Sequence, residues 1–342
     1  MVKQKNSERL GAIDPSLGES STGHKVLDVN DLRTYFFTRE GVVKAVDGVG
    51  FFLREDETIG LVGESGCGKT ITCLSILGLI TRPGRIISGH VLLDGEDLLK
   101  KSEREMAQIR GRRITMILQD PMTSLNPVLT IGNQVAEAIE THQRVRGHRL
   151  WEKTVEILRL VHIPSPEMRL GDYPHQMSGG MRQRVVGAAA LSCRPEVLIA
   201  DECTTSLDVT IQAQYLNLLK EVQNQLHVAM IFITHDLGIV AKMCDRVAVM
   251  YAGKIVESAQ MRELFHNPIH PYTAALLKSL PKLEGRQKWL TTIEGQPPSL
   301  LNLPPGCSFA PRCSQVDDHC LEEYPPSVSA NENHTVSCWR VV

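Results

Sequence analysis

Residues 63–70 read Gly-Glu-Ser-Gly-Cys-Gly-Lys-Thr, which matches the pattern G-x-x-x-x-G-K-[S/T]. In this pattern the backbone N–H groups of a glycine-rich loop converge on phosphate oxygens. An apolar run over residues 57–62 precedes the loop and another over residues 70–80 follows it, which predicts a buried strand and then a helix. The positive end of the helix dipole then faces the phosphates. We therefore predict a nucleotide site in which Lys69 reaches the β- and γ-phosphates and Thr70 binds Mg²⁺.

The rest of the chain continues an alternation of strands and helices. Apolar runs at 113–118, 197–200 and 229–233 predict interior strands, and shorter runs at 26–29 and 42–52 predict strands before the loop. Continuous apolar strands with helices between them indicate a parallel sheet that is covered on both faces. Residues 131–191 have little strand character and predict a helical subdomain. A proline-rich, irregular piece begins near residue 263.

Composition excludes several classes of protein. The 342 residues suggest about two domains, and 42% hydrophobic with 22% charged residues is typical of a globular chain rather than a disordered one. The net charge of −2 provides no global attraction for nucleic acid, which we do not expect as a partner. No apolar run approaches the roughly 20 residues of a transmembrane helix, and the polar first 24 residues lack a secretory signal. These features predict a cytoplasmic protein.

A second acidic site follows the run at 197–200, which ends in Asp201-Glu202. Adjacent residues of a strand point in opposite directions, so the two carboxylates can do different work. Asp201 can approach Mg²⁺ through water, and Glu202 can polarise an attacking water molecule.

Together these residues resemble the ATP-binding subunit of an ABC transporter, and most of all the dipeptide/oligopeptide importer ATPases. Four further motifs carry the resemblance, which covers about residues 25–340. They are Gln119 at the start of QDPMTSLNP (the Q-loop), Ser178-Gly179-Gly180 in HQMSGGMRQR (the signature), Thr205 to Asp208 (the D-loop) and His235 in FITHD (the switch histidine).

The resemblance implies an α/β fold of ABC type, a P-loop core with antiparallel β and helical subdomains. It also implies a small irregular Cys-rich C-terminal domain. We expect a flexible tail over 1–24, the ABC ATPase domain over 25–262 and a C-terminal domain of the peptide-importer type over 263–342. The residues assigned to ATP are Phe36, Gly63, Glu64, Ser65, Gly66, Cys67, Gly68, Lys69, Thr70, Ile71, Ser178, Gly179, Gly180 and Asp208.

The resemblance also assigns roles in hydrolysis. Glu202, His235 and Gln119 are the expected catalytic residues, with His235 on the γ-phosphate and Gln119 contacting Mg²⁺ or the attacking water. Thr70, Gln119 and Asp201 are the expected Mg²⁺ ligands. The signature precedes a helix expected to start near Met181 and implies a head-to-tail pair of subunits that encloses two ATP molecules. Phe36 is the expected aromatic on adenine, with Tyr35 as the alternative.

Three cysteine and methionine positions depart from the expected pattern or stand out within it. Cys203 occupies a position where the family usually has proline, so that turn can be more flexible, and Met181 replaces the glutamine of the signature. Cys67 lies within the phosphate-binding loop, where a helix N-terminus can lower the pKa of its thiol.

Four of the nine cysteines fall in the last 36 residues, at positions Cys307, Cys313, Cys320 and Cys338. In a reducing compartment this clustering favours metal over disulfides. Four thiolates can hold a [4Fe–4S] cluster or a tetrahedral Zn²⁺. The spacing C-x₅-C-x₆-C-x₁₇-C lacks the C-x₂₋₄-C pairs of zinc sites, and the resemblance implies a [4Fe–4S] cluster. Zinc and no metal remain the alternatives.

The implied function is ATP hydrolysis that powers the import of peptides from the cytoplasmic face of the membrane. The implied partners are a second ABC ATPase subunit, two transmembrane permease subunits and an extracytoplasmic peptide-binding protein. A soluble ABC ATPase and a redox or iron-sensing module are the alternatives. Dipeptides, oligopeptides, nickel chelates and antimicrobial peptides all remain open as substrates.

Overall fold

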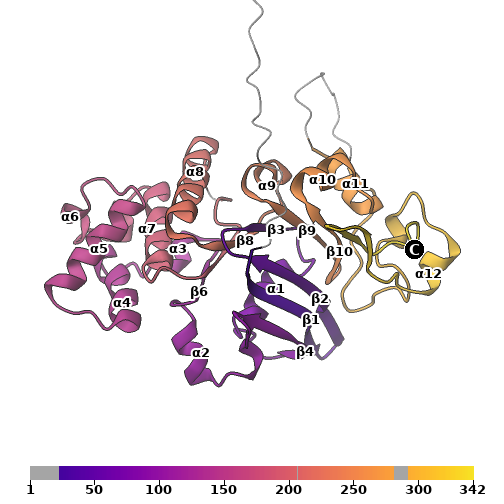
Figure 1. Ribbon diagram of the computed structural model, residues 1–342, viewed down its shortest axis with the longest axis horizontal. Coiled ribbons are helices and arrows are strands. Elements are labelled where there is room, and N and C mark those ends of the chain that lie inside the picture. Colours follow the sequence, from indigo (N-terminus) through magenta and orange to yellow (C-terminus); the bar gives the residue numbers. More distant parts are fainter. Residues whose placement is uncertain (1–22, 206, 281–291) are drawn as a thin grey trace, which may run out of the picture.

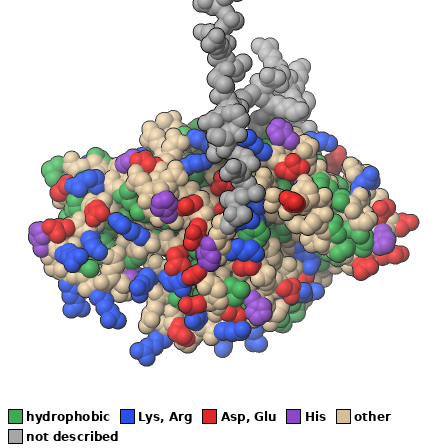
Figure 2. Space-filling view, viewed as in Figure 1, with side chains coloured by type: hydrophobic (Ala, Val, Ile, Leu, Met, Phe, Trp, Pro, Cys, Tyr) green, Lys and Arg blue, Asp and Glu red, His purple; other side chains and the backbone are tan. Residues whose placement is uncertain are grey.

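A computed structural model of the protein describes residues 23–205, 207–280 and 292–342, with the backbone alone at 121 and 122. The tail expected over 1–24 lies outside the described residues except for its last two. Two sheets form the centre of the molecule, and helices extend from them to both ends of its long axis (Figure 1). Charged side chains of both signs are interspersed on the face that Figure 2 shows.

The first sheet is antiparallel and has the order β2-β1-β4-β5. Its strands are β1 (Lys25–Thr38), β2 (Gly41–Arg54), β4 (Gly84–Leu93) and β5 (Glu96–Asp97). The strands β1 and β2 are longer than the sequence predicts. The register between them shifts at four places. Such irregularities interrupt the alternation of apolar and polar residues by which a strand is recognised.

The second sheet has the order β11-β12-β10-β9-β3-β8-β7-β6. Its strands are β3 (Thr58–Val62), β6 (Ile114–Ile117), β7 (Val197–Asp201), β8 (Ala229–Ile233), β9 (Arg246–Tyr251), β10 (Lys254–Gln260), β11 (Val328–Asn331) and β12 (His334–Val336). Neighbours from β6 to β9 pair in parallel. Every residue of β3, β7 and β8 is buried, which accounts for their continuous apolar sequences. The predicted parallel sheet is confirmed.

Helices surround this sheet. They are α1 (Lys69–Ile76), α2 (Glu103–Ile109), α3 (Pro121–Ser124), α4 (Ile131–Gln143), α5 (His148–Leu160), α6 (Pro166–Arg169), α7 (Gly179–Leu191), α8 (Val209–Leu226), α9 (Leu237–Met243), α10 (Met261–His266), α11 (Pro271–Lys278) and α12 (Asp318–Glu322). The helices α4 to α7 gather at one end of the molecule (Figure 1), in the range that the sequence predicts to be helical. Across the described ranges, no helix has both the length and the apolar composition that a membrane crossing requires.

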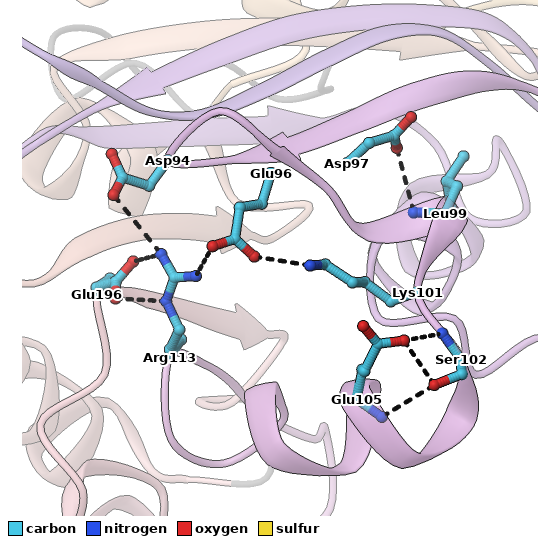
Figure 3. A network of polar contacts seen from close by, with 9 residues as sticks. All are labelled: Asp94, Glu96, Asp97, Leu99, Lys101, Ser102, Glu105, Arg113 and Glu196. Atoms are coloured by element: carbon cyan, nitrogen blue, oxygen red, sulfur yellow. Dashed lines mark hydrogen bonds and ion pairs between the residues drawn. The ribbon is translucent and has the colours of Figure 1, made fainter.

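An ion-pair network ties the antiparallel sheet to the second sheet (Figure 3). The Arg113 guanidinium, just before β6, donates to both carboxylate oxygens of Glu196, just before β7, at 2.7 and 2.9 Å. It also lies 3.8 Å from the carboxylates of Asp94 and Glu96, which flank the β4–β5 turn. These contacts lie at the amino ends of the parallel strands, so the carboxyl ends at the opposite edge remain available for a site.

The C-terminal region is less irregular than the sequence predicts, because its two short strands extend the core sheet. The strand β12 pairs antiparallel with β10, and β11 pairs with β12. Strands of three and four residues are too short to leave a recognisable pattern in the sequence. The region after residue 263 is therefore continuous with the sheet that carries the phosphate-binding loop.

A buried carboxylate anchors this connection. The Glu257 side chain in β10 is fully buried and lies 2.7 Å from the Nε2 atom of His334 in β12, which is also fully buried. The same carboxylate accepts the backbone N–H groups of Ile269 at 2.7 Å and His270 at 3.1 Å, just before α11. One side chain thus joins two strands and a helix start.

Replacing Glu257 by alanine is expected to lower the free energy of unfolding by about 3–5 kcal/mol, because two buried polar groups, on His334 and His270, and the part-buried N–H of Ile269 lose their partner. Chemical denaturation of the full chain measures this, with Glu152→Ala as the control, since Glu152 is an exposed carboxylate on α5. Equal stabilities of the two variants would contradict the anchoring role.

Candidate ATP-binding and hydrolysis site

The phosphate-binding loop connects β3 to α1 in a conformation that requires glycine. Gly63 has φ 151° and Gly68 has φ 108°. A Cβ atom at either position would lie 2.2 Å from a backbone oxygen, that of Met250 or Ala45. The Lys69 ammonium is almost fully buried and donates to the carbonyl oxygens of Gly63 at 2.8 Å and Glu64 at 3.1 Å. The loop therefore surrounds a cation with backbone groups, an arrangement suited to phosphate.

The first turn of α1 faces the end of β7. The Thr70 hydroxyl donates to Asp201 Oδ2 at 2.9 Å, although 131 residues separate the two. Burial raises the pKa of the Asp201 carboxyl. A cation bound beside it would act in the opposite direction and favour the charged form. Hydroxyl and carboxylate oxygens are the ligands that Mg²⁺ prefers. The structure thus brings together two of the three expected Mg²⁺ ligands. Ile71, half-buried, follows Thr70 in the same turn.

Three further predicted residues meet around one carboxylate. Glu202 accepts a hydrogen bond from Gln119 Nε2 at 2.9 Å, and His235 Nδ1 lies 3.5 Å from its other oxygen. These residues follow β6, β7 and β8, three neighbouring strands whose carboxyl ends share one edge of the sheet. Glu202 has φ 44°, and its N–H donates to the Ile233 carbonyl at 3.0 Å. The backbone turn thus places the carboxylate between the neighbouring strand ends.

The signature residues stand apart from this cluster. The helix α7 begins at Gly179, two residues earlier than predicted, because Ser178 caps it by accepting the N–H of Met181 at 3.3 Å. Gly179 and Gly180 thus lie in the first turn, where N–H groups lack partners within the helix. In Figure 1, α7 lies among the helices at one end of the molecule, away from α1.

The D-loop leads into α8. Asp208 caps this helix by accepting the N–H groups of Thr210 and Ile211 at 3.1 and 3.0 Å. Ser206 lies outside the described residues. A Cβ atom on Gly180 would lie 2.6 Å from the Ile211 side chain, so the starts of α7 and α8 are in close contact.

The two aromatic candidates for adenine differ in their contacts. The Tyr35 hydroxyl donates to Asp47 Oδ1 at 2.6 Å, and burial raises its pKa. Phe36 is half-buried and pairs with Val43 and Gly84 in the antiparallel sheet. Phe36 carries no polar group that would be engaged elsewhere, which favours it, and its role stays a prediction.

The expectation for Cys67 is wrong in direction. This thiol is nearly fully buried, and burial raises its pKa despite the nearby Lys69 ammonium. Cys203, at the usual proline position, is fully buried, and burial raises its pKa to about 12. Both thiols are therefore protonated at neutral pH.

The four C-terminal cysteines line one pocket, together with His270 and Phe309 among others. Cys320 and Cys338 are buried and the other two half-buried. Burial raises the pKa of Cys307 to about 11. Among the described residues, no group of three or more His, Cys, Asp or Glu side chains is arranged to hold a metal ion.

Contacts between the C-terminal region and the phosphate-binding loop are absent from the sequence prediction. Arg312 donates to both carboxylate oxygens of Glu64, and the Tyr272 hydroxyl accepts the Glu64 N–H at 3.0 Å. The partners are separated by 248 and 208 residues. The sequence around Arg312 and Tyr272 contains no pattern that predicts a contact with the phosphate-binding loop.

Comparison with known proteins shows the family of this chain. The family described as "ABC transporter" matches residues 46–205, and the one described as "Oligopeptide/dipeptide transporter, C-terminal region" matches residues 256–320. The chain is 50% identical over 316 residues to the dipeptide transport ATP-binding protein DppD of Bacillus subtilis, covering 92% of this chain and 94% of that protein. The chain belongs to the ABC transporter ATP-binding proteins of the dipeptide/oligopeptide family.

Other members of this family are similarly related. A probable peptide ABC transporter ATP-binding protein of Sinorhizobium fredii is 52% identical over 92% of this chain and 95% of its own length.

Among solved structures, a dimeric ATP-binding cassette bound to ADP and phosphate has a TM-score of 0.62 at 23% identity, over 69% of this chain and 99% of its own. The cbiO1 protein of Clostridium perfringens has a TM-score of 0.60 at 25% identity, over 71% of this chain and 91% of its own. These structures confirm the ABC nucleotide-binding fold.

Proposed function

We propose that this chain is the ATP-hydrolysing subunit of an ABC transporter that imports peptides across the cytoplasmic membrane. The observation that carries the proposal is the convergence of Gln119 and His235 on the Glu202 carboxylate, beside the Thr70–Asp201 pair. Binding and hydrolysis of ATP need these groups at one edge of the sheet. The names of relatives at about 50% identity supply the peptide as cargo.

Each residue has a role in this mechanism. Lys69 and the amides of the phosphate-binding loop bind the β- and γ-phosphates. Thr70, Asp201 and Gln119 would hold Mg²⁺, which supplies neutralisation of the charge on the phosphates. Glu202 accepts a proton from the attacking water.

Orientation supplies the rest of the catalysis. Gln119 fixes the Glu202 carboxylate through its 2.9 Å hydrogen bond. In this mechanism His235 donates to the γ-phosphate. Because hydrolysis of ATP needs no covalent enzyme intermediate, positioning and charge account for the rate.

The chain works as half of a head-to-tail pair. The first turn of α7, with Ser178, Gly179 and Gly180, presents N–H groups and a positive dipole end suited to phosphate. It stands away from the chain's own phosphate-binding loop (Figure 1), so it serves the nucleotide held by the loop of a partner subunit. Asp208 lies beside the signature on α8 and contributes to the same interface.

This pair docks on two transmembrane permease subunits at the cytoplasmic face of the membrane. The second ATPase is a homologous chain, and an extracytoplasmic binding protein delivers peptide to the permeases. A tagged copy of this chain, purified from solubilised membranes, should retain the second ATPase and both permeases, with peptide among the ligands of the complex. Recovery without any membrane subunit would instead support a soluble ABC ATPase.

We also propose that the C-terminal region holds a [4Fe–4S] cluster. One pocket is lined by all four cysteines, which come from segments up to 31 residues apart (307 to 338). Each iron of such a cluster takes one thiolate, so four separate segments suit it. Burial raises the pKa of the Cys307 thiol to about 11, and a bound metal would favour its thiolate form.

Replacing Cys313 by serine is expected to abolish absorption at about 400 nm in anaerobically purified protein, because one iron loses its thiolate. Iron and zinc contents measured by elemental analysis accompany the spectrum. The control is Cys193→Ser, since Cys193 lies in the linker after α7 and outside this pocket. Stoichiometric zinc without iron in the unmodified protein would replace the cluster by a zinc site.

A further inference from the structure

Arg312 is held as a buried, fully bonded cation against the phosphate-binding loop. Its side chain is 4% exposed. Two of its N–H groups donate to the Glu64 carboxylate at 2.6 and 3.0 Å. The others donate to the Tyr251 hydroxyl and to the carbonyl oxygens of Ile293 and Glu294, at 3.0 to 3.3 Å. All five donors of the guanidinium are used, so this is not a surface ion pair of negligible effect.

A second contact from the C-terminal region holds the backbone of the same loop residue. The Tyr272 hydroxyl accepts the Glu64 N–H at 3.0 Å. The Tyr272 ring packs on those of Tyr251 and Phe309, with centroids 4.5 and 5.3 Å apart. Residue Glu64 is thus fixed at its side chain and at its N–H, while its carbonyl oxygen accepts from Lys69.

The segment that carries Arg312 also carries two of the four clustered cysteines. Arg312 ends the short 3₁₀ helix Ala310–Arg312, which lies between Cys307 and Cys313. The N–H groups of Ala310 and Cys313 donate to the carbonyl oxygens of Cys307 and Ala310, at 3.0 and 3.2 Å. Any displacement of Cys313 therefore moves the adjacent Arg312.

We propose that Arg312 positions the phosphate-binding loop for Mg·ATP, and that it makes nucleotide affinity depend on the integrity of the four-cysteine site. The inference rests on the proposed ATP and cluster sites. An unpaired Glu64 carboxylate would add negative charge beside the triphosphate and free the loop, and both effects weaken binding. By linkage, bound Mg·ATP must raise the affinity of the C-terminal region for its metal by the same factor.

A double-mutant cycle on the full chain tests the first half of the proposal. The dissociation constant of Mg·ATP is measured by calorimetry for the unmodified protein, Arg312→Gln, Glu64→Gln and the double variant. With Glu64 present, Arg312→Gln is expected to raise the constant about tenfold, and in the Glu64→Gln background by less than about threefold. An equal penalty in both backgrounds would overturn the proposal, because a purely structural role of Arg312 does not depend on the charge of Glu64.

Two further variants keep the test decisive. If Arg312→Gln fails to fold, Arg312→Lys keeps the charge but not the bidentate contact with Glu64. An intermediate increase in the Mg·ATP dissociation constant is then expected. The control is Arg159→Gln, which removes an exposed ion pair with Glu167 and should leave the constant unchanged. If the unmodified protein does not bind Mg·ATP, the proposed function fails rather than this inference.

The Cys313→Ser variant tests the coupling. It is expected to weaken Mg·ATP binding by a factor similar to that of Arg312→Gln, and to add little to the effect of Arg312→Gln when the two are combined. Iron content is measured in parallel and should be lost in Cys313→Ser but kept in Arg312→Gln. Unchanged Mg·ATP affinity in Cys313→Ser protein that has lost its iron would overturn the coupling.

Discussion

Replacing Glu202 by glutamine is expected to lower the rate of ATP hydrolysis by about 10² to 10⁴-fold, the usual contribution of a general base. Glutamine has nearly the shape of glutamate but cannot take a proton from water at neutral pH. The contacts of Lys69, Thr70 and Asp201 do not involve this carboxylate, so Mg·ATP should still bind. With binding intact and cleavage blocked, the ATP-bound pair of subunits should persist.

Steady-state phosphate release by the assembled complex measures the rate, and the retained nucleotide is measured after rapid gel filtration. Glu196→Gln is a matched control, because Glu196 lies just before the opposite end of β7 and binds Arg113 instead (Figure 3). Turnover of Glu202→Gln close to that of the control would contradict the base assignment.

Replacing Lys69 by alanine is expected to weaken Mg·ATP binding by about 100-fold. The Lys69 ammonium is almost fully buried at the mouth of the loop, where it donates to two carbonyl oxygens. Hydrogen bonds between charged groups contribute about 1.5–3 kcal/mol each, and about 1.4 kcal/mol corresponds to a tenfold change in affinity, so the loss of two such contacts accounts for this factor.

Calorimetric titration of the full chain with Mg·ATP reads the effect directly. Lys100→Ala serves as the control, since Lys100 is a 73% exposed lysine paired with Asp97 and remote from the loop. Equal affinity of the two variants would show that the loop does not bind the phosphates through Lys69.

Much of the site could be predicted because its residues occupy fixed places relative to strands. The carboxyl ends of β6, β7 and β8 share one edge, so Gln119, Glu202 and His235 meet once the strands are recognised. The strands are recognisable because those buried on both faces are continuously apolar. The residue types and their places at the strand ends indicate the same site, and a short motif predicts a site when both agree.

Other features depend on contacts that no local pattern encodes. The residues of the Arg312–Glu64 pair are 248 positions apart. The strand β12 is joined to β10 by a short antiparallel pairing and by the buried Glu257–His334 contact. The pKa of Cys67 follows its burial rather than the helix end beside it, because desolvation exceeds the dipole effect in a nearly closed site.

ATP cleavage at this site is expected to drive the movement of peptide through an attached permease. The most direct test is uptake of a labelled peptide by proteoliposomes that contain the complete complex, with the binding protein on one side and Mg·ATP on the other. Uptake is expected to require Mg·ATP on the side of this chain and to be lost with Glu202→Gln. Uptake that is equal with and without ATP, or unaffected by Glu202→Gln, would contradict it.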